Sequence, residues 1–345
     1  MLFRRLPLSI TLTLFAGLLS VMTVASITVG PMNIGFFDSL SSLVNRSNQL
    51  APHINLVIHE IRLPRTLLCA IVGAILAMCG TVMQGLFRNP LAEPGIIGVS
   101  AGAALGAAIA IVLFSGISEQ FPAFMNLAAV PVFAFLGGAI TTVLVYKLGT
   151  SKFGTSVTIM LLAGVAISAL SGAGIGYLNF KADDQMLRDL TLWSMGSFAG
   201  ANWSSIALTG ISMVLLYWIF SRKAMALNAL LLGESEANHL GIPVQRLKRQ
   251  LILLAAIGVG VTVSVAGMIG FIGLVIPHLG RMLAGPDHRK LLPISALMGA
   301  ILLTSADMFA RVAVAPAELP VGIVTAIIGA PFFLYLLFQQ KGKIL

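Results

Sequence analysis

Ten apolar segments of about membrane length recur along the chain, and they restrict its fold more than any other feature. A transmembrane helix needs about 20 consecutive, mostly apolar residues to cross a bilayer core. Runs of this length predict helices, because lipid offers the backbone no hydrogen-bond partner. We expect an all-α polytopic membrane protein in which residues 1–345 form a single transmembrane domain. The predicted spans are Leu8–Gly30, Thr66–Leu86, Ile96–Phe114, Val130–Leu148, Val157–Tyr177, Ile206–Phe220, Leu251–Met268, Phe271–Leu283, Leu291–Ala310 and Val321–Phe338.

The charge distribution favours lipid over nucleic acid as the surroundings of this chain. Charged residues make up 10% of the sequence, against about 25% in a soluble domain. The net charge of +9 would suit a nucleic-acid partner, but ten spans with the amino terminus inside place 15 of the 21 Lys and Arg residues in the cytoplasm. That surplus is the positive-inside bias of membrane proteins. We therefore expect no nucleic-acid partner and predict that both termini are cytoplasmic.

A long polar stretch, Leu232–Arg249, interrupts the later spans. Good helix formers predict two short helices in it, Glu234–Leu240 and Val244–Lys248, separated by the breakers Gly241 and Pro243. A compact helical projection between membrane segments is a surface that another protein can bind.

The sequence lacks the motifs of a catalytic or metal-binding protein. It contains no GxxxxGK[ST] or HExxH motif and no Cys/His ligand cluster. We therefore predict no catalytic residue, no metal site and no permanently bound cofactor. An ion-coupled carrier would need ionisable groups at mid-membrane, yet Asp307 is the only acidic residue within a predicted span. Its expected role is an ion pair with Arg311, one helical turn further on.

Small residues recur at helical spacing in two spans. The third span carries Gly98, Gly102, Gly106 and Ala110, and the fifth carries Gly164, Ser168, Gly172 and Gly176. Each set lies on one helix face and lets another backbone approach closely. Helix packing is the expected role in the third span, whereas packing and the lining of a transport path both stay open for the fifth.

Three arginines are predicted on the outer side, where the charge bias disfavours them. Arg62 and Arg65 flank Leu63–Pro64 at the mouth of the second span, and Arg311 closes the ninth. They can serve as interface anchors. They can also dock an acidic partner, because guanidinium pairs with carboxylate in a bidentate fork.

The connector after the second span, Phe87–Gly95, reads FRNPLAEPG. Its two prolines force turns and Asn89 can cap. A tight connector and a cytoplasmic surface beside the polar stretch are both compatible with it.

Several long motifs resemble one family. They are RLPRTLL, MQGLFRNPLAEPGIIGVSAGAALGA, GESEANHLGIP and GFIGLVIPHLGRMLAGPDHRKLLP. From Ile61 onward the chain is similar to the FecCD-type permease subunits of ATP-binding-cassette importers for iron chelates and cobalamin. FRNPLAEPGIIGVSAGAALGA and LRDLTLWSMGSFAGANW look most like haemin permeases.

The resemblance implies an importer subunit that is not itself an enzyme. It implies a homodimer in a bacterial inner membrane, a translocation path at the dimer axis, a cytoplasmic ABC ATPase dimer and a periplasmic haem-binding protein. Haem would be the transported substrate. A ferric siderophore or cobalamin is the alternative substrate, and an ion-coupled secondary carrier is the rival from another class.

The resemblance also implies roles for individual residues, position by position. Arg62, Arg65 and Arg311 match the residues that dock the binding protein. Val157 and Thr158 match the cytoplasmic gate, although Val157 departs from the small polar pair expected there. With Gly164, Ser168 and Gly172 they form the predicted gate and path. The ATPase-coupling helices cover about 233–248, with Gly233, Glu234, Ser235, Glu236, Ala237, Leu240 and Gly241 as the coupling residues.

Overall fold

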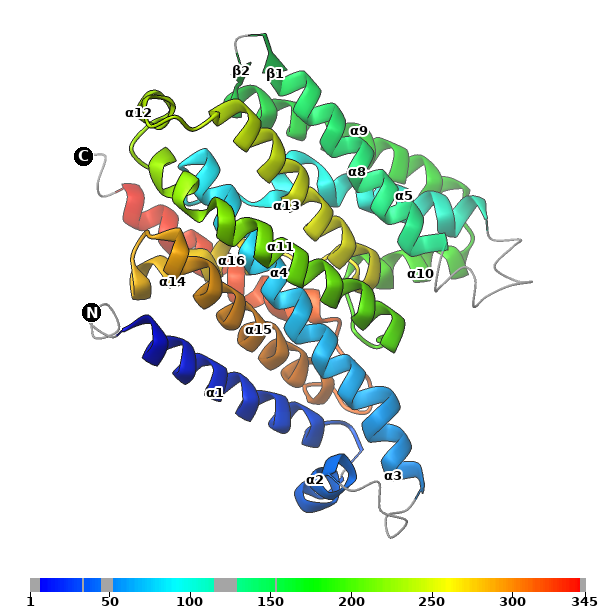
Figure 1. Cartoon of the computed structure of the whole chain (residues 1–345). Coiled ribbons are helices and arrows are strands. Elements are labelled where there is room, and N and C mark those ends of the chain that lie inside the picture. Colours follow the sequence, from blue (N-terminus) through cyan, green and yellow to red (C-terminus); the bar gives the residue numbers. More distant parts are fainter. Residues whose placement is uncertain (1–6, 33, 45–51, 115–128, 153, 342–345) are drawn as a thin grey trace.

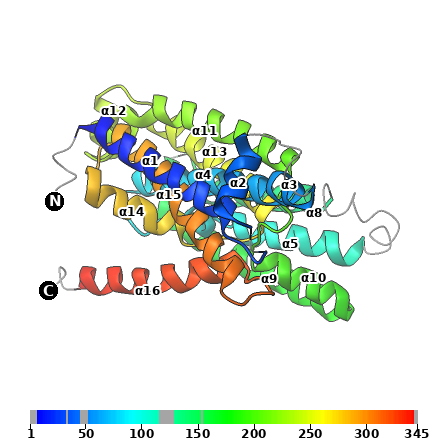
Figure 2. The same ribbon diagram turned by 90° about the horizontal axis from the view of Figure 1, so that it is seen from below.

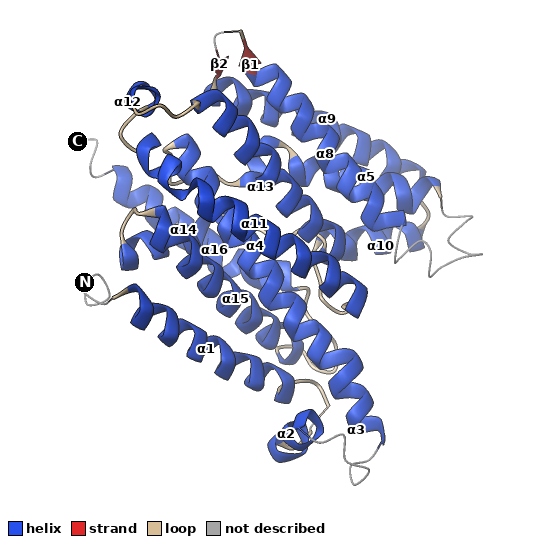
Figure 3. Ribbon diagram, viewed as in Figure 1, coloured by secondary structure: helices blue, strands red, loops and turns tan. Residues whose placement is uncertain are grey.

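The computed structural model describes residues 7–32, 34–44, 52–114, 129–152 and 154–341, and it is a bundle of helices (Figures 1 and 3). Each of the ten predicted spans is a helix. Within the described residues, eight helices are long and apolar enough to cross a membrane, and two shorter apolar helices, α5 and α14, complete the set. The ten are α1 (Leu8–Thr28), α4 (Leu63–Phe87), α5 (Val99–Leu113), α8 (Val130–Gly149), α9 (Val157–Lys181), α11 (Trp203–Leu230), α13 (Val244–Ala266), α14 (Ile272–Ala284), α15 (His288–Val312) and α16 (Val321–Lys341).

Short elements join these helices. A two-stranded antiparallel hairpin precedes α9 and pairs Thr150 with Thr155. The start of α1 and the end of α16 lie at the same end of the bundle as this hairpin and α12 (Figure 1). We call this end the α12 end. The short elements are α2 (Phe36–Val44), α3 (Pro52–Leu56), the π-helix η2 (Val57–Arg62), the 3-10 helix η3 (Pro94–Ile97), β1 (Thr150–Ser151), β2 (Gly154–Thr155), α10 (Asp184–Ser194) and α12 (Glu234–His239).

The helix α4 is the centre of the bundle. In its most apolar 18-residue window 83% of the residues are buried, against 17% in the corresponding windows of α1, α9 and α11. Its glycines allow backbone contact with two neighbours. A Cβ on Gly73 would lie 2.3 Å from the Gly299 carbonyl oxygen of α15, and one on Gly80 would lie 1.9 Å from the Gly273 carbonyl oxygen of α14. Small residues are what permit such approach between membrane helices.

The packing role predicted for the third span is confirmed. A Cβ on Gly102 would lie 2.4 Å from the Gly137 carbonyl oxygen, and one on Gly106 would lie 2.0 Å from that of Phe133. Both partners belong to α8. The Thr141 hydroxyl of α8 also donates to the Gly98 carbonyl at 2.9 Å, so α5 and α8 are joined by contact and by hydrogen bond.

The connector after α4 folds back into the bundle rather than forming an open surface loop. The Asn89 side chain accepts a hydrogen bond from the Leu91 N–H at 2.9 Å, which closes a tight turn. The Glu93 carboxylate then accepts from the Phe271 N–H at 3.2 Å, at the start of α14. Ala92 and Pro94 are buried. The structure therefore supports the tight-connector interpretation.

One prediction for the polar stretch is wrong. Val244–Lys248 is not a separate short helix but the beginning of α13, which runs unbroken from Val244 to Ala266. No proline lies between Val244 and Ala266, and the helix continues until Gly267 takes a positive φ. The first predicted helix does form, as α12, and it ends at His239 rather than Leu240.

Among the described residues, α9 and α16 are two of the helices that leave apolar side chains uncovered. Figure 2 shows α16, α9 and α10 along one edge of the molecule. The exposed side chains on α9 include Leu162, Val165 and Leu170, and those on α16 include Ile327 and Phe338. These surfaces suit contact with lipid or with a second apolar surface.

Candidate coupling and docking sites

The predicted coupling helix, α12, projects from one end of the bundle (Figure 1). Gly233 before it has a φ of +140° and Gly241 after it has a φ of +80°, conformations that favour glycine. Ala237 is fully buried and anchors the helix, whereas Leu240 is 64% exposed. Of the predicted coupling residues, Gly233 and Ala237 face the chain, Glu234 is half-buried, and Ser235, Glu236, Leu240 and Gly241 are exposed.

A buried lysine ties α12 to the hairpin before α9. Lys248, in the second turn of α13, is 2% exposed. Its Nζ donates to the Glu234 Oε1 of α12 at 2.6 Å and to the Thr155 carbonyl of β2 at 3.2 Å. The Gln245 Oε1 of α13 accepts from the Thr155 N–H at 2.9 Å. Thr155 is thus held on both sides of its backbone by one turn of α13.

The predicted gate residues lie at the same end. The Ser156 side chain caps α9 by accepting from the Ile159 N–H at 3.4 Å, as expected of serine at that position. Val157, next in the chain, packs against the core, and Thr158 is exposed. The structure therefore brings the predicted coupling and gate residues to one end of the molecule.

The predicted path residues on α9 divide into two kinds. Gly164 is buried, and a Cβ there would lie 2.1 Å from the Ile96 carbonyl oxygen, so this glycine serves packing. Ser168 is half-buried and Gly172 is exposed. In the described part of the chain, nothing lies within 4 Å of a Cβ built on Gly172. The outer half of the small-residue face is therefore open in this chain.

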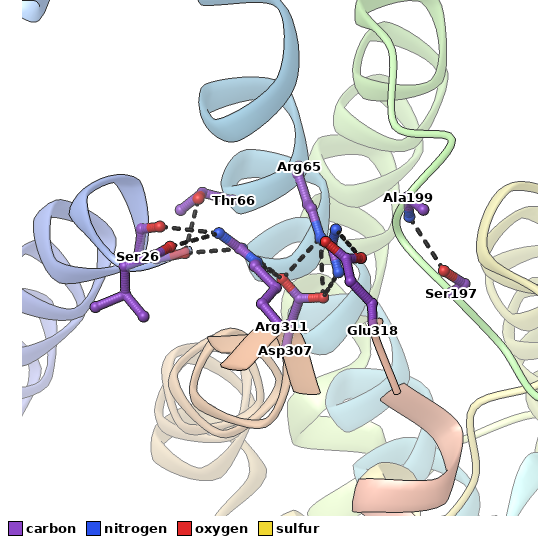
Figure 4. Close-up of polar contacts among 9 residues, drawn as sticks. Ser26, Arg65, Thr66, Ser197, Ala199, Asp307, Arg311 and Glu318 are labelled. Carbon is purple, nitrogen blue, oxygen red and sulfur yellow. Dashed lines mark hydrogen bonds and ion pairs between the residues drawn. The ribbon is translucent and has the colours of Figure 1, made fainter. Parts of the chain in front are cut away.

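At the opposite end, Asp307 lies between two guanidinium groups (Figure 4). Arg65 of α4 donates to Asp307 Oδ1 through Nη2 at 2.8 Å. Arg311 donates to Asp307 Oδ2 through Nε at 2.7 Å. The predicted Asp307–Arg311 ion pair is therefore confirmed, and Arg65 completes it. The Nη1 of Arg65 also pairs with Glu318 at 2.7 Å.

Arg311 and Arg62 also bind the end of α1. The Nη1 and Nη2 of Arg311 donate to the Ser26 carbonyl at 2.9 Å and the Ser26 hydroxyl at 3.0 Å. Arg62 donates to the Ile27 and Thr28 carbonyls at 2.9 and 2.8 Å. These charge-assisted bonds occupy guanidinium N–H groups that a partner would otherwise use.

The three arginines are buried within this chain. Arg62, Arg65 and Arg311 are 4%, 5% and 2% exposed, because they lie at the junction of α1, α4 and α15 and turn inward to carboxylates and carbonyls. Docking by these residues stays a prediction. Glu318, whose side chain is 31% exposed, is the part of the cluster that reaches the surface.

A further junction lies at the α12 end between α11 and α15. Asp287 caps α15 by accepting from the Arg289 N–H at 3.0 Å, and it accepts from the Asn228 side chain at 2.6 Å. Partial burial raises the pKa of Asp287, but the Asn228 and Arg289 hydrogen bonds outweigh it, so the pKa lies below its usual value.

Sequence reasoning missed Lys248, Gln245 and Thr155 as a group, and it missed Ser26 and Glu318 as partners of the arginines. The sequence marked Lys248 only as one of several cations predicted to be cytoplasmic. Its neighbours Leu247 and Leu251 belong to the buried face of α13, and a lysine beside such a face was the one available signal. Among the described residues, no group of three or more His, Cys, Asp and Glu is placed to hold a metal ion.

Comparison with known proteins gives one consistent answer. The model of the FecCD transport family matches residues 18–339. The hemin transport system permease protein HmuU of Yersinia pestis is 46% identical over 328 residues, 94% of each chain. The vitamin B12 import system permease protein BtuC of Vibrio cholerae is 39% identical over 330 residues, covering 96% of this chain and 94% of that one.

A solved structure agrees with these relatives. It is described as an inward-facing conformation of a metal-chelate type ABC transporter, is 35% identical in sequence and superposes with a TM-score of 0.82. The match covers 95% of this chain and 98% of that one. Together with the family match over residues 18–339, this shows that the chain belongs to the FecCD transport family.

Proposed function

We propose that this chain is the transmembrane permease subunit of an ATP-driven importer that moves haem across the bacterial inner membrane. The single observation that carries the proposal is α12, an exposed six-residue helix at one end of the bundle that is bonded to Lys248 of α13, which in turn bonds β2. A soluble ATPase can move helices that lie in lipid only by binding a part of the permease outside the membrane, and α12 is such a part. The permease is not itself an enzyme, and a separate subunit hydrolyses ATP.

The proposed assembly is a homodimer with two ATPase subunits and a periplasmic haem-binding protein. The α12 end faces the cytoplasm and the ATPase. The opposite end, with the Arg65–Asp307–Arg311 cluster, faces the binding protein. The uncovered apolar surfaces of α9 and α16 suit lipid and a second copy of the chain.

Haem is favoured as substrate by the 46% identity to a hemin permease, compared with 39% to a vitamin B12 permease. Haem is a flat, largely apolar dianion, so its path needs room and apolar walls with few strong iron ligands. The open face of α9 around Gly172 meets that need. A ferric siderophore or cobalamin is the alternative substrate for the same machine.

An ion-coupled carrier fits the geometry less well. Asp307, the acidic residue within a predicted span, is fully buried between Arg65 and Arg311. Both oxygens of this carboxylate accept hydrogen bonds from guanidinium groups, whereas an ion-coupled carrier needs an ionisable group that faces its transport path.

Uptake by proteoliposomes tests the proposal. The permease is reconstituted with its ATPase and the binding protein, and haem, cobalamin and a ferric siderophore are offered in parallel. We expect ATP-dependent haem uptake that survives an uncoupler of the proton gradient. Uptake of cobalamin or siderophore in preference to haem would replace the substrate, and uptake that needs no ATPase and collapses with the proton gradient would favour a secondary carrier.

A further inference from the structure

We propose that Lys248 is a positioning residue that transmits movement of α12 to the start of α9, and so links ATP hydrolysis to the gate. This role rests on the proposed function, in which α12 receives force from an ATPase. It assigns the internal connection through which that force reaches the transport path.

The first step is the contact between Lys248 and α12. The Nζ–Oε1 distance to Glu234 is 2.6 Å, and Lys248 is 2% exposed while the Glu234 side chain is 39% exposed. A buried ammonium group is costly without partners, so Lys248 holds Glu234 in place. Glu234 is the first residue of α12, which makes this ion pair the point where the helix is fastened to α13.

The second step is the contact between α13 and β2. Lys248 donates to the Thr155 carbonyl at 3.2 Å, and Gln245 accepts from the Thr155 N–H at 2.9 Å. The two α13 side chains lie one turn apart and bind the two polar groups of one residue. A displacement of this turn must therefore displace Thr155 or break both hydrogen bonds.

The third step runs from Thr155 into α9. Thr155 pairs with Thr150 in the hairpin, and the Ser156 N–H donates to the Gly149 carbonyl at 2.9 Å. Val157 follows Ser156 as the first residue of α9. No flexible linker separates Thr155 from the predicted gate at Val157 and Thr158, so movement of Thr155 reorients the first turn of α9.

The connection has the properties of a mechanical link. Lys248 bonds α12 and β2 through the same Nζ atom. The glycines that flank α12, Gly233 and Gly241, have positive φ angles and allow the helix to pivot about its ends. The ion pair between Glu234 of α12 and Lys248 of α13 opposes such pivoting. Because Lys248 also bonds Thr155, α12, α13 and β2 move as one unit.

The test compares Lys248→Met with Lys290→Met in proteoliposomes that contain the ATPase and the binding protein. Lys290 is an exposed lysine at the same end of the bundle, so its replacement controls for the loss of a cytoplasmic charge. We expect K248M to assemble and to hydrolyse ATP, with substrate uptake per ATP lower by about 5-fold or more, the lower limit for coupled sites. K290M should match the wild type.

Two further variants separate a coupling role from a structural one. Gln245→Ala removes the acceptor for the Thr155 N–H from an exposed side chain, and it should lower uptake per ATP in the same direction without affecting assembly. The double change Glu234→Lys with Lys248→Glu restores the ion pair but leaves the Thr155 carbonyl without a donor, and we expect it to remain uncoupled.

The outcomes that overturn the role of Lys248 are distinct from those that overturn the proposed function. ATPase-dependent uptake with wild-type uptake per ATP in K248M, or recovery in the charge-reversed double variant, would overturn the link through Thr155. If K248M does not assemble, wild-type coupling in Q245A would overturn it instead. Wild-type uptake that needs no ATPase would overturn the proposed function, and the role of Lys248 with it.

Discussion

Arg65 and Asp307 lie 242 positions apart in the chain and form a buried ion pair with an Nη2–Oδ1 distance of 2.8 Å. Arg311 pairs with the other carboxylate oxygen from within the same helix as Asp307. One carboxylate thus serves two guanidinium groups, and Ser26 brings α1 to the same cluster through Arg311. The cluster fixes the end of the bundle where α1, α4 and α15 meet.

Asp307→Asn should destabilise the protein strongly. The change removes the negative charge that Arg65 and Arg311 share, and breaking a buried ion pair in this way costs about 3–5 kcal/mol. The measurement is thermal unfolding of the purified permease in detergent. Glu318→Gln is the matched control: it removes a charge from the same cluster at a part-exposed position, where we expect about 1 kcal/mol or less. Similar losses from both variants would contradict a central role for Asp307.

Glu318→Ala tests the docking prediction without unfolding the cluster. Glu318 occupies the Nη1 of Arg65 at 2.7 Å, so an acidic partner that binds Arg65 must compete with it. Removing this carboxylate should tighten association with the binding protein by up to about 5-fold, the range for an exposed ion pair. Titration of labelled binding protein at low and high salt gives the affinity.

The control for this prediction is Glu60→Ala, which removes an exposed negative charge from the η2 helix next to Arg62. A general electrostatic effect would tighten binding equally in both variants. Unchanged affinity in Glu318→Ala would indicate that the partner binds elsewhere and that the three outer arginines serve the fold alone.

Local patterns were enough to predict the helices but not their neighbours. Each apolar run became a helix, because a long apolar segment has one good backbone solution in lipid. The glycine face of α5 likewise predicted close packing, and Gly102 and Gly106 contact α8. Neither pattern states which helix will lie opposite.

Contacts between distant segments could therefore not be predicted. The i,i+4 spacing indicated the Asp307–Arg311 pair, but the third member, Arg65, comes from the other end of the chain. Lys248 and Thr155 are 93 positions apart and carry no local sign of their contact. The inward orientation of Arg62, Arg65 and Arg311 could not be predicted for the same reason. Hydropathy indicates the depth of a residue in the membrane but not the partner that its side chain faces.

Leu240→Asp tests whether α12 is the site that binds the ATPase. Leu240 is 64% exposed, so the change should leave the fold intact. Loss of an apolar anchor at the centre of an interface costs about 2 kcal/mol, roughly 30-fold in affinity. Co-purification and titration with the ATPase measure the effect. Met282→Asp, at a residue 62% exposed on α14, is the control and should bind normally.

A second variant at α12 tests its shape rather than its surface. Gly241 has a φ of +80°, which a β-branched side chain does not tolerate. Gly241→Val should therefore misplace Leu240 and uncouple ATP hydrolysis from uptake. Undiminished uptake in both Leu240→Asp and Gly241→Val would contradict the assignment of α12.

Asp287 should contribute an acid-sensitive part of the stability. Its pKa in the folded protein lies below the usual value, so its stabilisation is present above pH 4 or so and is lost as the pH falls through the folded-state pKa. Asp287→Asn should reduce the loss of thermal stability as the pH falls below about 4, measured in detergent. An unchanged acid profile would show that other carboxylates determine it.

Ser168→Trp tests whether α9 lines the transport path. Ser168 is half-buried, and one turn further along the same face Gly172 is open, so an indole there would fill space that a flat macrocycle needs. We expect uptake at a tenth of wild type or less, equivalent to a barrier raised by about 1.4 kcal/mol, with dimer assembly and ATPase binding intact. Ser212→Trp, at a half-buried serine of α11, is the control and should transport normally.

If α9 instead packs against another part of the assembly, the Ser168→Trp protein will be destabilised outright, and Val157→Cys will find no disulfide partner in a second copy. A stable and fully active Ser168→Trp dimer would remove α9 from the path, because a side chain of that size cannot share a narrow channel with haem.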